Sequence, residues 1–178
     1  SPSFRKQRKT GIQPLRNGRG GFNVLWIGLM KALFLVLISL SLFSRMLVAE
    51  DLRSGEYTIS QSWKQERSYK RLYVVSVPEG RKGKRPVVIF LHGGGGNARG
   101  AFNGFLRRHR AMARHYIVIC PEGYGRSWNI VSERSKADDR GFIESIIKKV
   151  AGYDNVQKEN FSIIGSSNGA ALANQIAI

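Results

Sequence analysis

The chain has 178 residues, of which 29 are Lys or Arg and 12 are Asp or Glu, for a formal net charge of +17. This length suits one domain, and a hydrophobic fraction of 42% argues against a disordered protein. The single cysteine, Cys120, excludes an intramolecular disulfide. With only three histidines besides, we expect no metal site and no cofactor.

The charge is unevenly distributed along the chain. Residues 1–49 contain eight basic residues and no acidic one, whereas residues 50–178 carry a net charge of +9. A basic surface can serve a nucleic acid or another anionic partner. The basic residues of 50–178 are scattered, however, and no nucleic-acid-binding motif accompanies them. We therefore expect a solvated basic surface and no nucleic-acid partner.

An apolar segment near the N-terminus predicts export. Met30 and Lys31 precede the run ALFLVLISLSLFS at residues 32–44. Thirteen residues are short for a bilayer span, which needs about 20, but they fit the hydrophobic region of a secretory signal whose basic start is Lys31. We interpret 30–49 as a signal peptide cleaved after Ala49, and 1–29 as a basic upstream segment outside the natural translation product.

The mature protein is then secreted or periplasmic and touches a membrane only transiently, through the signal segment. The competing interpretation is a membrane anchor over residues 24–44. Such an anchor must bury Lys31 near its middle, at a cost of about 3 kcal/mol.

Residues 50–178 show the pattern of an α/β domain. Alternating segments at Tyr57–Trp63 and Lys70–Val77 predict a two-stranded hairpin. Three short apolar runs predict strands buried on both faces of a parallel sheet: Val87–Leu91, Tyr116–Cys120 and Phe161–Ile164.

Helices are expected between these strands. One is predicted over Phe102–Ala113, and a second runs to about Val150 from a cap at Asp138 or Asp139. The alternation of strands and helices indicates a three-layer α/β fold with a mostly parallel sheet.

The first motif that carries chemistry is Gly165-Ser166-Ser167-Asn168-Gly169, between a predicted strand and a helix-like run. This is G-x-S-x-G in the strand–turn–helix context of a nucleophile elbow. The nucleophile of such an elbow occupies a strained turn, so small residues must flank it for the strand and helix to pass closely. Ser167 would project above the sheet, and the N–H of Asn168 would point at a developing oxyanion. Taken alone, the pattern also fits an ordinary strand-to-helix turn.

The second motif is Leu91-His92-Gly93-Gly94-Gly95-Gly96, directly after an earlier strand. In α/β-hydrolases an HGGG-type loop supplies the other oxyanion N–H. We assign Gly94 as this donor, with Gly93 as the next candidate, and expect His92 to hold the loop by hydrogen bonds. A phosphate-binding loop is disfavoured because no G-K-[ST] follows the glycines.

Beyond these motifs, the stretch from Tyr69 to Ile178 resembles the N-terminal half of the polyhydroxybutyrate depolymerase / feruloyl esterase-like branch of secreted α/β-hydrolases. The matching pieces are RLYVVSVP at 71–78, PVVIFLHGGGG at 86–96, CPEG at 120–123, Trp128-Asn129, ADDRGF at 137–142 and GSSNGA at 165–170. The resemblance implies a serine esterase with Ser167 as nucleophile and Asn168 and Gly94 as oxyanion donors. Ala170 and Arg140 depart from the usual residues of that family, and neither touches the proposed chemistry. Trp128 is a candidate for the wall of the substrate cleft.

The partners of the nucleophile are missing from the chain. In this fold the triad acid and His follow the nucleophile, and residues 168–178 contain no Asp, Glu or His. The chain also stops at Ile178 within a helix-like stretch. We therefore expect a fold truncated after the nucleophile elbow, and a fragment that is poorly folded and inactive by itself.

The predicted activity of the full-length protein is hydrolysis of carboxylic esters through an acyl-enzyme, with an ester substrate that can be polymeric. Polyhydroxyalkanoate, feruloyl and related acyl esters all fit. Three alternatives stay open on the sequence: a peptidase or acyltransferase of the same fold, a secreted binding module that lost the triad, and a membrane-anchored adaptor built on residues 1–49.

Overall fold

The structure is a computed structural model that describes residues 26–36, 50–80, 83–131 and 136–176. It divides the chain into two units, residues 1–48 and 49–178. In the first unit, residues 26–36 form a helix with exposed side chains. The helices of the described residues are all too short or too polar to span a bilayer. The rest of the predicted signal, 37–49, and residues 1–25 lie outside the described part of the chain.

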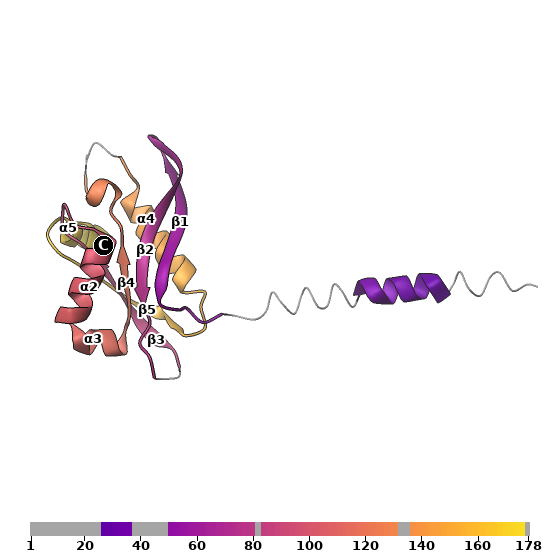
Figure 1. Cartoon of the computed structure of the whole chain (residues 1–178). Coiled ribbons are helices and arrows are strands. Elements are labelled where there is room, and N and C mark those ends of the chain that lie inside the picture. Colours follow the sequence, from indigo (N-terminus) through magenta and orange to yellow (C-terminus); the bar gives the residue numbers. More distant parts are fainter. Residues whose placement is uncertain (1–25, 37–49, 81–82, 132–135, 177–178) are drawn as a thin grey trace, which may run out of the picture. The chain divides into compact units, whose positions relative to one another are not determined.

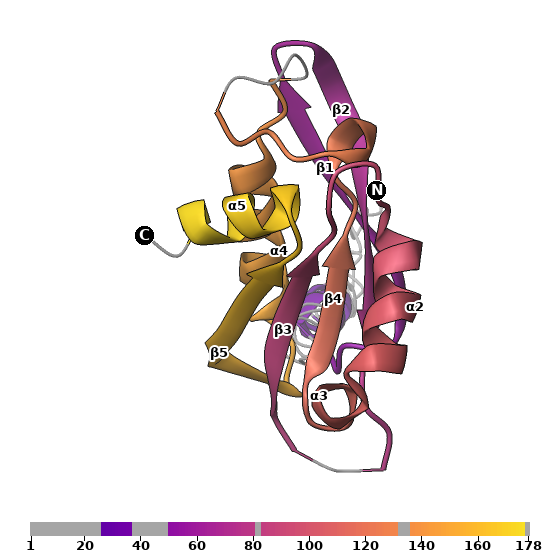
Figure 2. The same cartoon turned by 90° about the vertical axis from the view of Figure 1, so that its left-hand side faces the viewer.

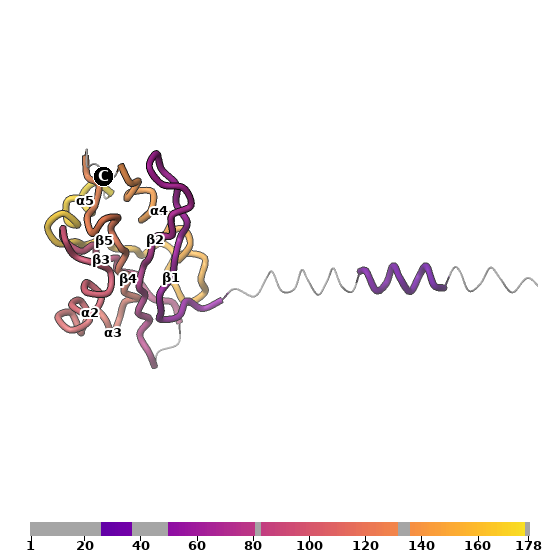
Figure 3. Tube along the Cα trace, turned by 45° about the horizontal axis from the view of Figure 1, so that its top comes forward, coloured from indigo at the N-terminus to yellow at the C-terminus, as the bar shows by residue number. Residues whose placement is uncertain are grey.

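The second unit is built on a five-stranded mixed sheet with the order β1-β2-β4-β3-β5 (Figures 1 and 2). Strands β1 (Gly55–Trp63) and β2 (Glu66–Ser76) form the predicted antiparallel hairpin, which Figure 3 traces as one continuous loop of chain. Strand β2 pairs antiparallel with β4 (Ile117–Pro121). Strand β3 (Arg85–Leu91) pairs in parallel with β4 on one side and with β5 (Val156–Gly165) on the other.

Helices cover the sheet on two faces, so the domain has three layers. Helices α2 (Ala98–Arg108) and α3 (Arg110–His115) lie on one side of the strands and α4 (Asp139–Val150) on the other, as Figure 1 shows. Helix α5 (Asn168–Ile176) contributes to the same core as α4. Because successive side chains of a strand point to opposite faces of the sheet, each strand contributes side chains to both helical layers.

Two hydrophobic cores result from this alternation. The larger core joins α4 and α5 to the inner face of the sheet and includes Val87, Ile89, Ile117 and Phe142, all fully buried. Each such side chain stabilises the fold by about 1.5–3 kcal/mol. The smaller core lies under α2 and α3 and contains Val88, Phe105, Val118 and Cys120.

Two predicted elements differ from the structure. The helix expected over Phe102–Ala113 is two helices, separated at His109, whose backbone leaves the helical region (φ −118°, ψ 50°). The N–H of His109 donates to the carbonyl of Phe105 at 2.8 Å, and the carbonyl of His109 accepts the N–H of Ala113 at 3.0 Å, so this residue ends one helix and begins the next.

The second difference concerns the final strand. Strand β5 was expected to be buried on both faces, but it forms an edge of the described sheet and is longer than predicted. Ser162 is exposed and Ile164 is 37% exposed. The described residues of α2 and α3 pack on β3 and β4 and leave this face of β5 uncovered.

The three parallel strands run in the same direction and end at one edge of the sheet (Figure 2). From that edge emerge the glycine loop after β3, the 3₁₀ turn η1 (Tyr124–Arg126) after β4, and α5 after β5. The carboxyl ends of parallel strands are where open α/β sheets bind ligands. Both motifs found in the sequence therefore meet at one place.

Candidate active site

Ser167 occupies the sharp turn that connects β5 to α5. Its φ of +50° lies in the left-handed region, which a residue other than glycine adopts only at a local cost. The carbonyl of Ser167 accepts the N–H groups of Ala170 (2.9 Å) and Ala171 (3.2 Å), so the residue begins the helix. The N–H of Ser166 donates to the carbonyl of Leu91 at 3.1 Å, which ties the turn to β3. The side chain of Ser167 is exposed at the end of this support.

The two glycines of G-x-S-x-G are sterically required. A Cβ on Gly165 would overlap the backbone of Gly169 on the facing helix. A Cβ on Gly169 would lie 2.5 Å from the carbonyl oxygen of Leu91 and would also overlap that of His92. Real Cβ atoms do not approach backbone oxygens so closely, so strand and helix can pass at this distance only with hydrogen in both positions.

The glycine loop after β3 lies against the elbow. A Cβ built on Gly93 would lie 3.5 Å from the Cβ of Ser167, and one on Gly94 would lie 3.9 Å from the Cβ of Asn168. Gly95 adopts φ +77° and donates its N–H to the carbonyl of Arg126 at 2.8 Å. Within the described residues, the N–H groups of Gly94 and Asn168 find no acceptor. Two backbone donors without an acceptor among those residues therefore belong to the loop and the elbow that meet here.

His92 holds this loop and is itself buried, with 3% of its surface exposed. Its Nε2 accepts the N–H of Gly123 at 3.0 Å, so the ring proton is on Nδ1, which donates to the carbonyl of Gly93 at 2.8 Å. Both ring nitrogens are thus engaged with backbone groups. The geometry agrees with the structural role expected for His92 and leaves it no free nitrogen for proton transfer.

The expectation that Trp128 lines the substrate cleft needs correction. Trp128 is fully buried, and its indole Nε1–H donates to the carbonyl of His92 at 2.7 Å. Its ring lies 4.8 Å from that of His92. A side chain that has no exposed surface and whose N–H is already hydrogen-bonded cannot contact a substrate. Trp128 instead supports the glycine loop through its hydrogen bond to His92.

The side chain of Asn168 fastens the elbow to the loop after β4. Its Oδ1 accepts the N–H of Trp128 (2.7 Å) and the hydroxyl of Ser127 (3.2 Å), while its Nδ2 donates to the carbonyl of Trp128 at 3.2 Å. These contacts hold residue 168 by its side chain and do not use its backbone N–H.

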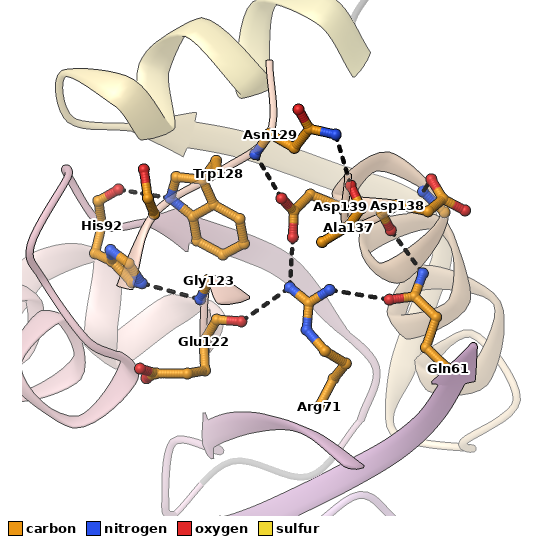
Figure 4. A network of polar contacts seen from close by, with 12 residues as sticks. Gln61, Arg71, His92, Glu122, Gly123, Trp128, Asn129, Ala137, Asp138 and Asp139 are labelled. Carbon is orange, nitrogen blue, oxygen red and sulfur yellow. Dashed lines mark hydrogen bonds and ion pairs between the residues drawn. The ribbon is translucent and has the colours of Figure 1, made fainter. Parts of the chain in front are cut away.

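A buried ion pair beneath this loop was not anticipated. The guanidinium of Arg71 donates from Nη2 to Oδ1 of Asp139 at 2.5 Å, and both side chains are fully buried (Figure 4). The same guanidinium donates to the carbonyl of Glu122 (3.1 Å) and to Oε1 of Gln61 (2.9 Å). It also lies over the ring of Phe142, 4.2 Å from its centroid.

Asp139 extends the network toward the loop of Trp128. Its second oxygen accepts the N–H of Asn129 at 2.6 Å. Burial raises the pKa of the Asp139 carboxyl, and Arg71 and the N–H of Asn129 oppose that rise. The neighbouring Asp138 caps α4 by accepting the N–H of Gly141 at 2.9 Å, so the predicted capping role belongs to Asp138.

A signal for Arg71 was present in the sequence. It alternates with Tyr73 and Val75, so the three residues share the buried face of β2. A basic residue that shares the buried face of a strand with apolar residues must have a buried partner. Nothing in the local pattern indicates that this partner is Asp139, which is 68 residues away.

The cysteine and the other two histidines take no part in the candidate site. Burial raises the pKa of the Cys120 thiol to about 12, which agrees with its predicted role as a small hydrophobe. His109 and His115 end α2 and α3, and His115 precedes β4, at the opposite end of the strand from η1. In the described ranges, no group of three His, Cys, Asp or Glu side chains is placed to hold a metal ion.

The chain resembles known esterases in sequence and in fold. No protein-family model matches the chain. An acetylxylan esterase of Coprinopsis cinerea is 30% identical over 138 residues, which cover 72% of this chain and 36% of that protein. A thermostable esterase of known structure superposes with a TM-score of 0.51 at 23% identity, over 66% of this chain and 35% of the other. An S-formylglutathione hydrolase from Agrobacterium tumefaciens gives 0.53 at 18% identity, over 70% and 52%.

The chain has the α/β-hydrolase fold. The strand order, the three layers and the two motifs at the carboxyl ends of the strands agree with this assignment. The chain spans about a third of the length of the acetylxylan esterase that it matches.

Proposed function

We propose that the chain carries the nucleophile and the oxyanion hole of an exported serine hydrolase of carboxylic esters. The observation that carries the proposal is the strained, exposed Ser167 against the glycine loop, together with the N–H groups of Asn168 and Gly94, which have no acceptor among the described residues. Gly93 is the alternative donor, since it borders the same serine. The likeness to an acetylxylan esterase and to structures of esterases supports the activity.

The chemistry follows from this geometry. The Ser167 oxygen attacks the ester carbonyl carbon while a general base takes its proton, and the electron pair of the carbonyl moves to its oxygen. The two N–H groups accommodate that negative charge, and removal of one such donor typically costs 10²–10³ in turnover. Collapse of the intermediate expels the alcohol, which takes the proton back from the base, and leaves an acyl-serine. Water then cleaves this ester, releases the carboxylic acid and restores the hydroxyl of Ser167. The proposed steps call on no metal and no cofactor.

The base and its acid are not supplied by residues 168–178, which contain no Asp, Glu or His. His92 has both nitrogens engaged, and His109 and His115 do not lie on the loops around Ser167. We therefore propose that residues 1–178 alone do not turn over an ester. Hydrolysis of p-nitrophenyl acetate at the rate of the buffer alone is expected, and fluorophosphonate labelling of Ser167 would contradict this part of the proposal.

The substrate class we propose is an acyl ester on a polysaccharide, with acetyl and feruloyl groups ahead of a polyester. The name of the acetylxylan esterase and the resemblance to the polyhydroxybutyrate depolymerase / feruloyl esterase-like branch support this order. We also propose export through the signal at 30–49. N-terminal sequencing of the secreted protein should start near Glu50, whereas a start upstream of Met30 would indicate the anchor.

A thiol in place of the nucleophile tests the site without requiring turnover. In Ser167→Cys, the helix N-terminus and the free N–H groups should lower the thiol pKa below the usual value of about 8.5. The pH dependence of iodoacetamide alkylation reports that pKa. Ser166→Cys is the matched control, since its side chain is exposed one residue earlier, and Cys120 stays silent because it is buried. Equal midpoints for the two variants would refute the placement of Ser167 in an oxyanion hole.

A further inference from the structure

A groove beside the candidate active site has no role in the proposed reaction. Its volume is about 670 Å³, and it lies between the start of β2, the N-terminal turn of α2 and η1. Tyr69 and Lys70 come from β2, Asn97 and Arg99 from the start of α2, and Tyr124 and Arg126 from η1.

One wall of the groove is shared with the oxyanion loop. The carbonyl of Arg126 accepts the N–H of Gly95, and the Arg126 side chain donates from Nε to the carbonyl of Gly96 at 3.4 Å. Two residues further on, Trp128 is bonded to the side chain of Asn168. The short segment 124–128 therefore links the groove to the elbow, so a polymer with its ester at Ser167 could place a neighbouring unit in the groove.

The charges of the groove leave two cations without carboxylate partners. Arg71 is neutralised by Asp139, and Arg99 forms a two-point ion pair with Glu56 at 2.5 and 2.7 Å. The Glu122 carboxylate caps α2 by accepting the N–H of Ala98. Among the described residues, Lys70 and Arg126 have no carboxylate within ion-pair distance. Against these two cations stands the Glu122 carboxylate, so the side chains that line the groove keep an excess of one positive charge.

Aromatic rings give the same groove a rigid apolar wall. Trp63, Tyr69 and Tyr124 contact one another edge to face, with centroid separations of 4.9–5.7 Å. The hydroxyl of Tyr124 donates to Glu66 at 2.6 Å, which fixes that ring further and raises its pKa. Tyr69 is 40% exposed. Rings held in place lose little entropy when a ligand packs against them.

We propose that this groove binds an acidic sugar unit, a uronate, of the polysaccharide that carries the ester. A pyranose ring combines an apolar face for Tyr69 and Tyr124 with hydroxyls for Asn97. Its carboxylate matches Lys70 and Arg126, which are the only cations lining the groove that lack a carboxylate partner among the described residues. The link to ester cleavage rests on the function proposed above, whereas binding of the sugar does not.

The test is calorimetric titration of the full chain in low salt. The probes are xylotetraose and the same oligosaccharide bearing one glucuronate branch. We expect the acidic oligosaccharide to bind about tenfold more tightly, and the preference to shrink in 0.5 M NaCl because the ion pairs are partly exposed. Lys70→Gln and Arg126→Gln should each weaken it about threefold, and the double variant should bind both probes equally.

Lys148→Gln, which removes an exposed cation on α4, is the control and should bind as the unmodified chain does. Circular dichroism confirms that each variant is folded. Equal affinity for the two probes, or equal loss in Lys148→Gln and Lys70→Gln, would overturn the proposal. Tighter binding of a single-stranded oligonucleotide than of the acidic sugar would overturn it too. The alkylation profile of Ser167→Cys is read separately, so failure of the sugar site and failure of the nucleophile are distinguishable.

Discussion

Replacing Asp139 by Asn should destabilise the domain far more than the same change at Asp138. Both oxygens of Asp139 accept hydrogen bonds, one from Arg71 and one from the N–H of Asn129. Asparagine has a single acceptor oxygen, so its amide N–H₂ must face one of these donors. The substitution also leaves the Arg71 guanidinium fully buried without its counter-charge.

The magnitude follows from the contacts that remain. Removing one partner of a buried ion pair costs about 3–5 kcal/mol. Arg71 keeps its bonds to Gln61 and to the carbonyl of Glu122, and it keeps its position over Phe142, so the lower end applies. We expect a loss of about 3 kcal/mol in the free energy of unfolding, which corresponds to a decrease in Tm of roughly 10 °C.

Urea unfolding of the full chain, followed by circular dichroism and tryptophan fluorescence, measures this loss. Asp138→Asn is the matched control, because Asn caps a helix about as well as Asp and residue 138 is exposed. The double variant Arg71→Met/Asp139→Leu should recover much of the loss, since it removes both charges. The reasoning fails if Asp139→Asn and Asp138→Asn unfold at urea midpoints that correspond to the same stability.

Three further results are expected. Gly169→Ala should lower the free energy of unfolding in urea by about 1–3 kcal/mol, because the new Cβ meets backbone carbonyls. Gly104→Ala in α2 has open space around its Cβ and should be neutral or stabilising by up to about 1 kcal/mol. Equal effects of the two substitutions would contradict the close passage of strand and helix. Cys120, with a pKa of about 12, should stay unmodified by a disulfide reagent at pH 8 and react fully in urea; rapid labelling of the folded protein would show that the strand is accessible. Trp128→Phe removes the donor to the carbonyl of His92 and should cost about 1–3 kcal/mol, and an unchanged unfolding midpoint would rule out that support.

Much of the fold could be predicted because its signals are local. The hairpin of β1 and β2, the strands β3 and β4 and the helix α4 are close to their expected ranges. Alternation and helical periodicity depend only on neighbours within a few residues, so they survive in a single sequence. The break at His109 escaped prediction because the apolar pattern of residues 102–113 continues across it, and the exposed face of β5 escaped it because that exposure depends on what covers the sheet.

The candidate site also contains residues that the sequence points to and residues that only the structure places. Ser167 and the glycines of both motifs could be proposed from the sequence because the turn and the close backbone approach restrict residue type at fixed spacing. The structure brings Gly93 and Gly94 beside Ser167 and Asn168, as the motifs predict. Trp128 was assigned to the cleft because an aromatic loop residue has the same pattern whether it is exposed or buried.

The sequence by itself determined the fold class, the order of the strands along the chain and the residues of the two motifs, since these depend on local periodicity and on steric limits of the backbone. Only the tertiary structure decided that Arg71 pairs with Asp139, that His92 binds Gly123 and that Lys70 and Arg126 line one groove. These residues lie about 30 to 70 positions apart in the chain. For the buried Arg71, Asp139 and His92, burial makes such contacts necessary, because charged and polar groups removed from water must find partners, but only the packing of the strands and helices determines which partners they find.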